Sequence, residues 1–383
     1  MKNKVLIMYT GYKPAKTYGG IVNSISNIIE ACGTEKDFFV IASNHELNDD
    51  RPIEGIKTGW NKVDLAEVLY LSNEELNVKN IYKQIEKIKP DVIYLQSLFL
   101  YKYLFASIKY ANKYNVKIVL APRGELCKNA FALKKLKKQI YVKALKILGI
   151  NKKMIYHSTS DEETNCVSKI LNVKKEFIKQ VSVIPTKTNI ETNKKIKEKD
   201  KLKCVFISRI TAKKNLLKAI EYVNAAKTGV ELDIYGFIED KEYWQKCSNE
   251  MQKCKKVKYC GSLEPKEVVN KFKEYDLFLF PTLSENYGHV IAESMIAGCP
   301  VLISDQTPWN DVKNYNGGFV VQVNNDNEFV NVLNQLVHMD NETYTLIKQG
   351  CTKYIKQKID YEGITKQYLG LLDKEKKNES IAN

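Results

Sequence analysis

The stretch Pro281-Thr-Leu-Ser-Glu-Asn-Tyr-Gly-His-Val-Ile-Ala-Glu-Ser-Met-Ile-Ala-Gly-Cys-Pro300 decides the fold, and it lies between two apolar segments. Asp276–Phe280 before it and Val301–Ser304 after it have the composition of buried strands. The stretch itself has the pattern of a polar loop that opens an amphipathic helix. Strand, loop, helix and strand make up half of a nucleotide-binding α/β domain, whose ligand is expected at the carboxyl end of the strand.

Two carboxylates, Glu285 and Glu293, stand eight positions apart across the predicted helix start. In a fully helical segment they would lie about 12 Å apart along the axis, roughly the span of a sugar diphosphate plus ribose. The amides of Gly288, His289 and Val290 lie between them, at the positive end of the helix dipole. This geometry predicts two hydroxyl-rich groups that flank a diphosphate, as in a nucleotide sugar.

The same stretch resembles the signature of the retaining glycosyltransferases of family 4, which have the GT-B fold. The Glu–seven residues–Glu spacing is common by chance, but Asn286–Glu293 and Ala297–Val301 around it make the match specific. The resemblance implies that Glu285 and the Asn286–Gly288 backbone orient the transferred sugar and that Glu293 holds the ribose. Donor contacts are implied for Asn286, Tyr287, Gly288, His289 and Val290. The alternative interpretation is an N-capped core helix with two solvent-exposed carboxylates.

Length and composition suit a globular protein with two α/β domains, because 383 residues exceed one ordinary core. No apolar run approaches the roughly 18 residues of a membrane span, and the N-terminus lacks a secretory pattern. The nine cysteines are scattered and contain no C-x-x-C pair. We therefore expect a reducing cytoplasm and neither a disulfide framework nor a zinc site.

The net charge of +15 comes almost entirely from dispersed lysines. Such a charge would hold the protein near anionic lipid, at the inner face of the plasma membrane. Nucleic acid is the competing partner, but no aromatic–basic RNA signature, basic zipper or zinc finger is present, so none is expected. Only three arginines occur, and Arg123 and Arg209 fall in loops directly after predicted strands. A planar guanidinium suits phosphate or carboxylate, so this placement favours a ligand role.

Alternating strands and helices predict two Rossmann-like, doubly wound parallel sheets, which in the GT-B architecture face a cleft. The predicted domains are 1–185 on the acceptor side and 202–359 for the nucleotide sugar, joined by a polar linker over 186–201. By resemblance, a final helix over 360–373 crosses back to the first domain, and 374–383 is a charged tail. The predicted strands are Lys4–Tyr9, Phe38–Ala42, Asp91–Gln96, Lys117–Ala121, Met154–His157, Val181–Pro185, Lys203–Ile207, Glu231–Tyr235, Val257–Cys260, Asp276–Phe280, Val301–Ser304 and Phe319–Val323.

The segment Cys204–Leu216 resembles the strand and phosphate loop that opens the family's second domain. Ser208 and Asn215 replace the two usual glycines, while Arg209 and Lys214 keep their register. Two cations facing a diphosphate would neutralise it and stabilise the leaving phosphate, so both are predicted to be catalytic together with Glu285. The alternative is a solvated basic turn. Asn215 tolerates a left-handed backbone better than most residues.

Three further glycine-containing segments resemble donor-side loops of the family. Gly236 and Leu263 are implied to contact the base, although a glycine at a strand end is also routine in turns. Gly19 and Gly20 resemble the glycine loop of the first domain, where the backbone approaches the donor phosphate or the acceptor. The G-x-G-x-x-G fingerprint of dinucleotide-binding domains is absent.

A second group of residues is predicted on the acceptor side. Arg123, Gly124 and Glu125 follow a strand at the place where many relatives carry a histidine. Arg123 is predicted to contact the acceptor or donor phosphate, and Glu125 to shape the acceptor pocket. His157 is interpreted as a satisfied structural residue rather than a base.

The helix predicted over Phe131–Leu148 has two interpretations. One apolar stripe could face the core while the lysines are solvated, or the helix could lie on an anionic membrane or dock a pyrophosphate-linked acceptor. The stripe consists of Leu133, Leu136, Ile140, Ala144 and Ile147, and the lysines are Lys134, Lys135, Lys137, Lys138, Lys143 and Lys146.

The sequence contains no Asp-x-Asp, the motif with which metal-dependent glycosyltransferases usually place their cation. We therefore expect metal-independent transfer without a cofactor, with cationic side chains and helix amides in the place of Mg²⁺. The prediction is a retaining glycosyltransferase with a UDP-hexose or UDP-N-acetylhexosamine donor and a glycan or polyprenyl-linked glycan acceptor in bacterial surface polysaccharide assembly. GDP-mannose is the alternative donor. A nucleotide-sugar epimerase of the same fold and a non-enzymatic basic binding protein are the alternative classes.

Overall fold

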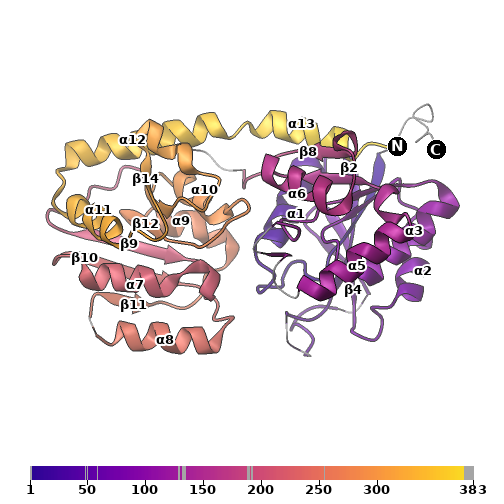
Figure 1. Cartoon of the computed structure of the whole chain (residues 1–383), viewed down its shortest axis with the longest axis horizontal. Helices are drawn as coiled ribbons and strands as arrows, with labels where there is room; N and C mark the ends of the chain where they lie inside the picture. Colours follow the sequence, from indigo (N-terminus) through magenta and orange to yellow (C-terminus); the bar gives the residue numbers. More distant parts are fainter. Residues whose placement is uncertain are drawn as a thin grey trace. The chain divides into compact units, whose positions relative to one another are not determined.

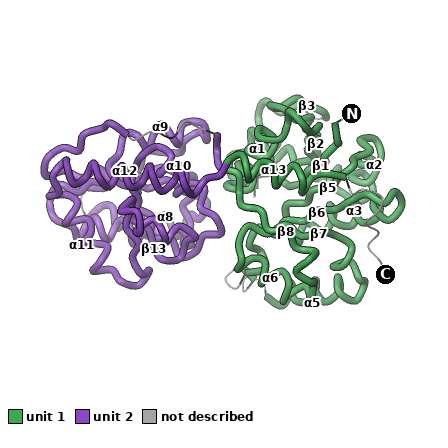
Figure 2. The backbone as a smooth tube through the Cα atoms, turned by 90° about the horizontal axis from the view of Figure 1, so that it is seen from above, with its two compact units in different colours: residues 1–184, 361–383 green, residues 185–360 purple. Residues whose placement is uncertain are grey.

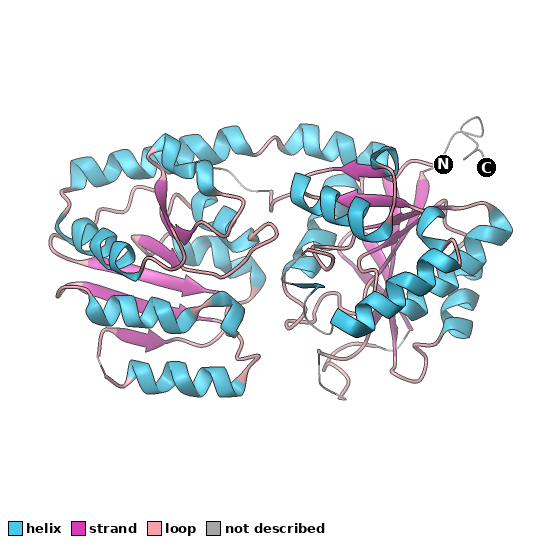
Figure 3. Cartoon of the chain, in the orientation of Figure 1, coloured by secondary structure: helices cyan, strands magenta, loops and turns pink. Residues whose placement is uncertain are grey.

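The computed structural model describes residues 2–374 except 48, 50, 58, 128–129, 132–134, 188–189, 191–192 and 254 (Figure 1). The chain forms two compact units, Met1–Ile184 with Tyr361–Asn383 and Pro185–Asp360 (Figure 2). Each unit is built on a largely parallel sheet with helices packed around it (Figure 3). The predicted fold class, two Rossmann-like α/β domains, is confirmed.

The first unit holds, within the described residues, a sheet of eight strands in the order β3-β4-β2-β1-β5-β6-β7-β8. All pairs are parallel except β3 with β4. The strands are β1 Asn3–Met8, β2 Lys36–Ser43, β3 Gly59–Val63, β4 Ala66–Leu71, β5 Val92–Leu95, β6 Lys117–Leu120, β7 Ile155–Ser158 and β8 Ile178–Gln180. The helices are α1 Gly20–Cys32, α2 Val78–Ile88, α3 Tyr101–Tyr114, α5 Lys135–Ile147, α6 Asp161–Leu171 and α13 Tyr361–Leu371.

Both faces of this sheet are buried, which is why its strands read as continuous apolar runs. Successive residues of a strand point to opposite faces. In β1, Val5 and Ile7 therefore join one core, whereas Leu6 and Met8 join the other. The first core is closed by α1 and α13, and the second by α2, α3, α5 and α6.

Helix α13 is a part of the first unit although it follows all of the second unit in the sequence. Its buried residues Ile364, Tyr368 and Leu371 pack in the same core as α1. The Tyr368 ring also meets the ring of His157 edge-on, with the centroids 5.3 Å apart. The first unit therefore needs the end of the chain to complete one face of its sheet.

The second unit holds, in its described part, a fully parallel sheet of six strands in the order β11-β10-β9-β12-β13-β14. Its strands are β9 Leu202–Ile207, β10 Val230–Tyr235, β11 Val257–Tyr259, β12 Leu277–Phe280, β13 Val301–Ser304 and β14 Gly318–Val321. Its helices are α7 Leu216–Ala225, α8 Lys241–Met251, α9 Val268–Phe272, α10 His289–Ile296, α11 Asp326–His338 and α12 Asn341–Lys358.

Two details of the first unit differ from the sequence-based prediction. The antiparallel pair β3 and β4 was not predicted, and the strand predicted over Val181–Pro185 is replaced by the shorter β8, which ends at Gln180. Val181 still donates its amide to the carbonyl of Ser158, but Ser158 is the last residue of β7, so the residues that follow have no strand to pair with.

The packing of α13 gives a testable prediction. Tyr368 is fully buried, so Tyr368→Ala removes a large aromatic side chain from the core that α1 and α13 share. We expect the unfolding free energy of the first unit to fall by about 3 kcal/mol or more, measured by urea titration. Lys366→Ala, at an exposed position of the same helix, is the matched control. Equal stability of the two variants would show that α13 does not complete the core.

Candidate active site

The predicted donor residues gather at one edge of the second unit's sheet. Strands β9 and β12 are neighbours in its middle, and the order of strands along the chain reverses between them. In open α/β sheets, ligands bind outside the carboxyl ends of the strands at such a point. Arg209 and Lys214 follow β9, and Glu285 follows β12, so all three leave the sheet at this edge.

Lys214 and Glu285 form an ion pair in which the Lys214 ammonium contacts the Glu285 carboxylate. The two side chains are only 13% and 8% exposed. Thr282 donates a hydrogen bond from its hydroxyl to the same Glu285 oxygen, at 3.2 Å. A buried charge is costly unless it is paired, so each of these two groups fixes the position of the other.

The loops after β9 and β12 are also joined through their backbones. The Leu283 amide donates to the Lys213 carbonyl at 2.9 Å, and the Asn215 side-chain amide donates to the Pro281 carbonyl at 2.9 Å. Asn215 has a φ of 59° and lies in the left-handed region, where the family's usual glycine would lie without strain. The substitution of Asn for Gly is therefore compatible with the loop conformation.

Helix α10 begins directly behind this ion pair. Gly288 precedes it with a φ of 76°, a conformation that residues with a Cβ rarely adopt. A Cβ at Gly288 would lie 2.9 Å from the Ile291 side chain and 3.5 Å from Cγ of Glu285. The amide of Val290 belongs to the first turn, whose N–H groups have no acceptor within the helix. The helix start therefore presents partial positive charge close to Glu285.

Glu293 lies further along α10 and is 8% exposed. Burial raises the pKa of its carboxyl group from 4.5 to about 7. Among the described residues, no hydrogen-bond partner of this carboxyl group is found. The carboxyl oxygens keep some accessible surface, so a ligand with hydroxyl groups can reach them and supply the missing hydrogen bonds.

The segment between the two glutamates is held by aromatic packing. The Tyr287 ring lies 5.0 Å from the His289 ring and 5.2 Å from the Trp309 ring, measured between centroids. The Trp309 indole N–H donates to the Tyr287 carbonyl, and the Glu285 amide donates to the Gln306 carbonyl at 3.0 Å. Asn286, within this segment, is half-buried. The segment that would contact the donor is therefore supported by the chain that follows β13.

Arg209 is engaged elsewhere on this edge. Its guanidinium donates to the Glu239 carboxylate at 2.5 Å, and both side chains are about one-third exposed. Lys214 and Glu285 are therefore brought together, whereas Arg209 pairs with the loop after β10.

The two residues implied at the base, Gly236 and Leu263, follow β10 and β11 at the same edge. A Cβ at Gly236 would lie 1.8 Å from the Ser208 carbonyl oxygen, so only glycine allows this close approach of two backbones. The Gly236 amide donates to the Gly261 carbonyl at 2.8 Å, and Tyr259 donates its hydroxyl to the Gly236 carbonyl. Leu263 is half-buried against the core of the unit.

In the first unit, Gly19 and Gly20 form the start of α1. Gly19 is the N-cap with a φ of 66°, and no side chain caps the helix there. The preceding Tyr18 is buried and donates its hydroxyl to the His45 carbonyl at 3.1 Å. The Tyr18–His45 contact ties the glycine loop to the segment that follows β2. The loop lies between β1 and the start of α1, as its sequence pattern predicted.

Arg123 and Glu125 have their polar groups satisfied within the first unit. Arg123, with a φ of 54°, donates to the side-chain Oε1 of Gln96 at 3.0 and 2.7 Å and to the Tyr94 hydroxyl at 3.2 Å. Glu125 accepts hydrogen bonds from the Ser97 hydroxyl at 2.6 Å and the Leu98 amide at 3.0 Å, and burial raises its pKa to about 7.

Gly124, between them, has a φ of 77° and donates its amide to the Glu163 carboxylate at 2.6 Å. The Arg123–Glu125 loop is therefore rigidly held at both of its charged residues and at its central amide.

His157 is a satisfied structural residue, as the sequence suggested. Its Nδ1 meets the Tyr94 hydroxyl at 2.6 Å, and its Nε2 meets the Val181 carbonyl at 2.9 Å. The carbonyl can only accept, so Nε2 carries the proton and Nδ1 accepts from the tyrosine. Burial, followed by the charge of Arg123, lowers the His157 pKa to about 3. The ring therefore stays neutral.

Helix α5 faces the core with a different stripe from the one that the sequence suggested. Val142 and Leu145 are its buried residues. Leu136, Ile140 and Ile147 of the predicted stripe are 71%, 62% and 75% exposed. The core-facing interpretation of that stripe is therefore wrong for these residues, while Leu133 and Lys134 lie outside the described residues.

Three residues that shape the donor edge were not predicted from the sequence. Thr282 supports Glu285, Glu239 pairs with Arg209, and Trp309 holds the Tyr287 backbone. Thr282 lies within the quoted stretch and could have been found there. Nothing in the sequence links the other two to their partners across the fold.

Residues 187–353 match the family model described as Glycosyl transferases group 1. This span contains all of the donor-edge residues described above. The second unit is therefore a group 1 glycosyl transferase domain, and the chain is a glycosyltransferase with the GT-B fold.

Solved structures and one curated protein are similar along nearly the whole chain. The structure of HepE from Anabaena in complex with UDP and glucose has a TM-score of 0.72 and a sequence identity of 15%. The match covers 97% of this chain and 99% of HepE. The structure of TarM from S. aureus, in a complex that contains UDP, has a TM-score of 0.72 and a sequence identity of 12%. The match covers 97% of this chain and 100% of TarM. An uncharacterized 41.2 kDa protein in the cps region of Klebsiella pneumoniae is 24% identical over 373 residues, which are 92% of this chain and 95% of that protein.

The raised pKa of Glu293 makes a prediction about stability. Between pH 4.5 and pH 7 the unfolded chain loses the Glu293 proton that the folded chain keeps, so this group lowers the unfolding free energy as the pH rises. Glu293→Gln removes that dependence. The unfolding free energy of the variant should rise relative to that of the wild type by up to about 3.5 kcal/mol between pH 4.5 and pH 8, since about 2.5 pKa units at about 1.4 kcal/mol each are involved.

Urea unfolding of both proteins at pH 5 and pH 8 measures this difference. Glu242→Gln, at an exposed position of α8, is the matched control and should show no such pH-dependent gain. A gain for Glu293→Gln that is independent of pH would contradict the burial of this carboxyl group.

Proposed function

We propose that the chain is a retaining glycosyltransferase with a nucleotide-sugar donor, in which a UDP-hexose or UDP-N-acetylhexosamine is favoured. The acceptor is a saccharide or a polyprenyl-diphosphate-linked saccharide in bacterial surface glycan biosynthesis. The UDP in the HepE and TarM complexes supports the choice of nucleotide. The similar Klebsiella protein is described as lying in the cps region, and this supports the choice of pathway.

One observation carries the proposal. The buried Lys214–Glu285 pair lies next to the start of α10, and the same helix holds the buried, unpartnered Glu293. A cation and helix amides suit a diphosphate. A carboxylate on either side of them suits the hydroxyl groups of a sugar and of a ribose. The pattern of charge and hydrogen-bonding groups is that of a nucleotide sugar.

In the proposed reaction, Lys214 and the Gly288–Val290 amides hold the diphosphate. They stabilise the negative charge that develops as the bond between the sugar C1 and the phosphate oxygen breaks. Arg209 contributes to the same charge by exchanging its bond to Glu239 for a phosphate oxygen. Glu285 accepts hydrogen bonds from the sugar hydroxyl groups, and Glu293 accepts from the ribose.

The acceptor hydroxyl forms its bond to C1 from the face that the phosphate leaves, and its proton passes to the departing phosphate oxygen. This route needs no protein nucleophile and conserves the configuration at C1. Lys214 and the helix amides supply the positive field that a metal ion provides in other enzymes, so we propose metal-independent transfer. Activity that is unchanged by EDTA is the expected result.

The ion pair between Lys214 and Glu285 would open when a donor binds. Without a donor, the ammonium and the carboxylate satisfy one another. When a sugar diphosphate binds, phosphate oxygens share the ammonium while sugar hydroxyl groups compensate the carboxylate. The two charges therefore exchange their mutual contact for contacts with adjacent parts of one substrate.

Nucleotide binding is tested by thermal-shift titration with UDP, GDP, ADP and TDP. A nucleotide at a hundred times its dissociation constant stabilises the folded chain by about 2.7 kcal/mol. We expect UDP to raise the melting temperature of the wild type, and Glu293→Ala to lose this nucleotide-dependent shift. Glu242→Ala, on the exposed side of α8, should keep it.

The other outcomes separate the alternatives. A shift with GDP alone would replace UDP by GDP and favour GDP-mannose as donor. No shift with any of the four nucleotides, or one that survives Glu293→Ala, would contradict the donor site. Conversion of the nucleotide sugar to its epimer without an acceptor would identify an epimerase. Binding to random nucleic acid that high salt abolishes, unaffected by Glu293→Ala, would indicate a basic binding protein.

We also propose that the enzyme acts at the inner face of the plasma membrane, through helix α5. None of the helices in the described part of the chain has the length and apolarity that a membrane span requires. The exposed side chains of Leu136, Ile140 and Ile147 lie on α5 among exposed lysines. Those lysines are Lys135, Lys137, Lys143 and Lys146. An apolar stripe flanked by positive charge fits the surface of an anionic bilayer, where a lipid-linked acceptor would lie.

Co-sedimentation with lipid vesicles tests this role. The wild type should bind vesicles that contain phosphatidylglycerol more tightly than vesicles of phosphatidylcholine alone. Ile140→Asp combined with Ile147→Asp should weaken binding by about tenfold or more, because the two aliphatic side chains would no longer be buried in the bilayer. Leu346→Asp, at an exposed apolar residue of α12, is the control. Equal binding to both vesicle types, or equal binding of both variants, would contradict the proposal.

A further inference from the structure

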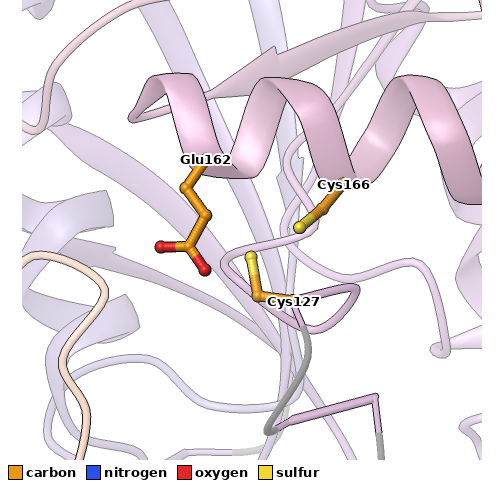
Figure 4. A group of neighbouring side chains, drawn as sticks. All are labelled: Cys127, Glu162 and Cys166. Atoms are coloured by element: carbon orange, nitrogen blue, oxygen red, sulfur yellow. The ribbon is translucent and has the colours of Figure 1, made fainter. Parts of the chain in front are cut away.

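A cluster of metal-ligating groups lies in the first unit and contains none of the residues to which a role was assigned above. Cys127, Glu162 and Cys166 each offer one ligand atom, and these atoms all lie within 4.8 Å of one another. Figure 4 shows the two sulfur atoms turned toward one another with the Glu162 carboxylate beside them. Two thiols and a carboxylate from two different elements meet here without a disulfide.

The local structure sets these groups in place. Glu162 and Cys166 are four residues apart on α6 and therefore share one face of the helix. Cys127 comes from the loop after β6, where its amide donates to the Gly124 carbonyl at 3.0 Å. Glu163, the neighbour of Glu162, fastens this loop to the first turn of α6, since its carboxylate accepts from the amide of Gly124 and from the amide and hydroxyl of Thr159. The cluster is therefore organised before any ligand arrives.

The chemistry of the three groups selects the ion. Thiolates bind borderline-soft cations such as Zn²⁺, whereas Mg²⁺ and Ca²⁺ prefer oxygen ligands only. Tetrahedral Zn²⁺ with bonds to sulfur of about 2.3 Å places two sulfurs about 3.8 Å apart. The observed cluster needs a movement of about an ångström or less to reach that geometry. Both cysteines are half-buried and Glu162 is exposed, so one side of the cluster opens to water for a fourth ligand.

We propose that Cys127, Glu162 and Cys166 form a Zn²⁺ site that clamps the loop after β6 to helix α6. The ion would join the segment that carries Arg123 to α6 at a second point, next to the Gly124–Glu163 hydrogen bond. Its effect is on the rigidity and stability of the first unit. The proposed transfer of sugar does not involve it.

Metal binding must displace protons from the thiols. Uptake of the ion should therefore acidify a weakly buffered solution.

The test uses the full chain, reduced and stripped of metal with a chelator, and Co²⁺ as a spectroscopic probe. We expect uptake of one ion per chain with an absorption band for charge transfer from thiolate to Co²⁺, which Zn²⁺ then abolishes. Cys127→Ser and Cys166→Ser should each lose the band. Glu162→Gln should keep thiolate ligation but bind at least about tenfold more weakly, because even indirect partners of a metal contribute that much.

Cys260→Ser, which removes a half-buried thiol of the second unit, is the matched control and should keep the band. A second readout needs no variant, since Zn²⁺ should protect two thiols of the wild type from alkylation, identified by peptide mapping as Cys127 and Cys166. Absence of a thiolate band after reduction, protection of other cysteines, or a band that survives both serine variants would overturn the site.

Discussion

The ion pair between Lys214 and Glu285 is the interaction on which the donor edge depends. It joins the loops that follow the two central strands of the second sheet, and both partners are largely withdrawn from water. Loss of one partner of such a pair costs about 3–5 kcal/mol, because the other charge stays buried and unpaired. Thr282, the Leu283 amide and the Asn215 side chain then hold the loops in the register that this pair requires.

The same constraint explains why the proposed donor carries two kinds of groups. A free phosphate could satisfy Lys214 but would leave the Glu285 carboxylate without a partner. A free sugar could satisfy Glu285 but would leave the ammonium unpaired. In the proposed function a sugar diphosphate satisfies both, and its ribose binds the carboxyl group of Glu293 on α10. The proposed function therefore has nucleotide and sugar recognised jointly.

The sequence was sufficient to predict the elements whose patterns are local. The central strands, the helix start at Gly288 and the left-handed Asn215 each follow from a short pattern of apolar residues, glycine or asparagine. Contacts between distant segments could not be predicted this way. The sequence places Arg209 on the diphosphate, but in the fold it pairs with Glu239, and periodicity alone could not tell which apolar stripe of α5 faces the core. The β3–β4 pair was missed because β3 is short and only two of its five residues, Trp60 and Val63, are large and apolar.

The buried charged and polar side chains near the predicted sites differ between the two units in whether they have hydrogen-bond partners. Arg123, Glu125 and His157 are all satisfied by neighbours of the same unit, whereas Glu293 in the second unit is not. The groups of Arg123 and Glu125 hold the loop after β6 in shape. The carboxyl group of Glu293 is the one that the proposed function assigns to the ribose.

The most direct test of the account follows the hydrolysis of a donor labelled with ¹³C at C1, such as UDP-glucose or UDP-N-acetylglucosamine, by NMR without an acceptor. Water then takes the place of the acceptor, and the configuration of the first-formed sugar reports the geometry of attack. We predict that the α-anomer appears first. Glu285→Gln should lower the rate of hydrolysis by about a hundredfold or more, since a group that orients the reacting sugar is lost. The β-anomer as first product, or an unchanged rate in the variant, would contradict it.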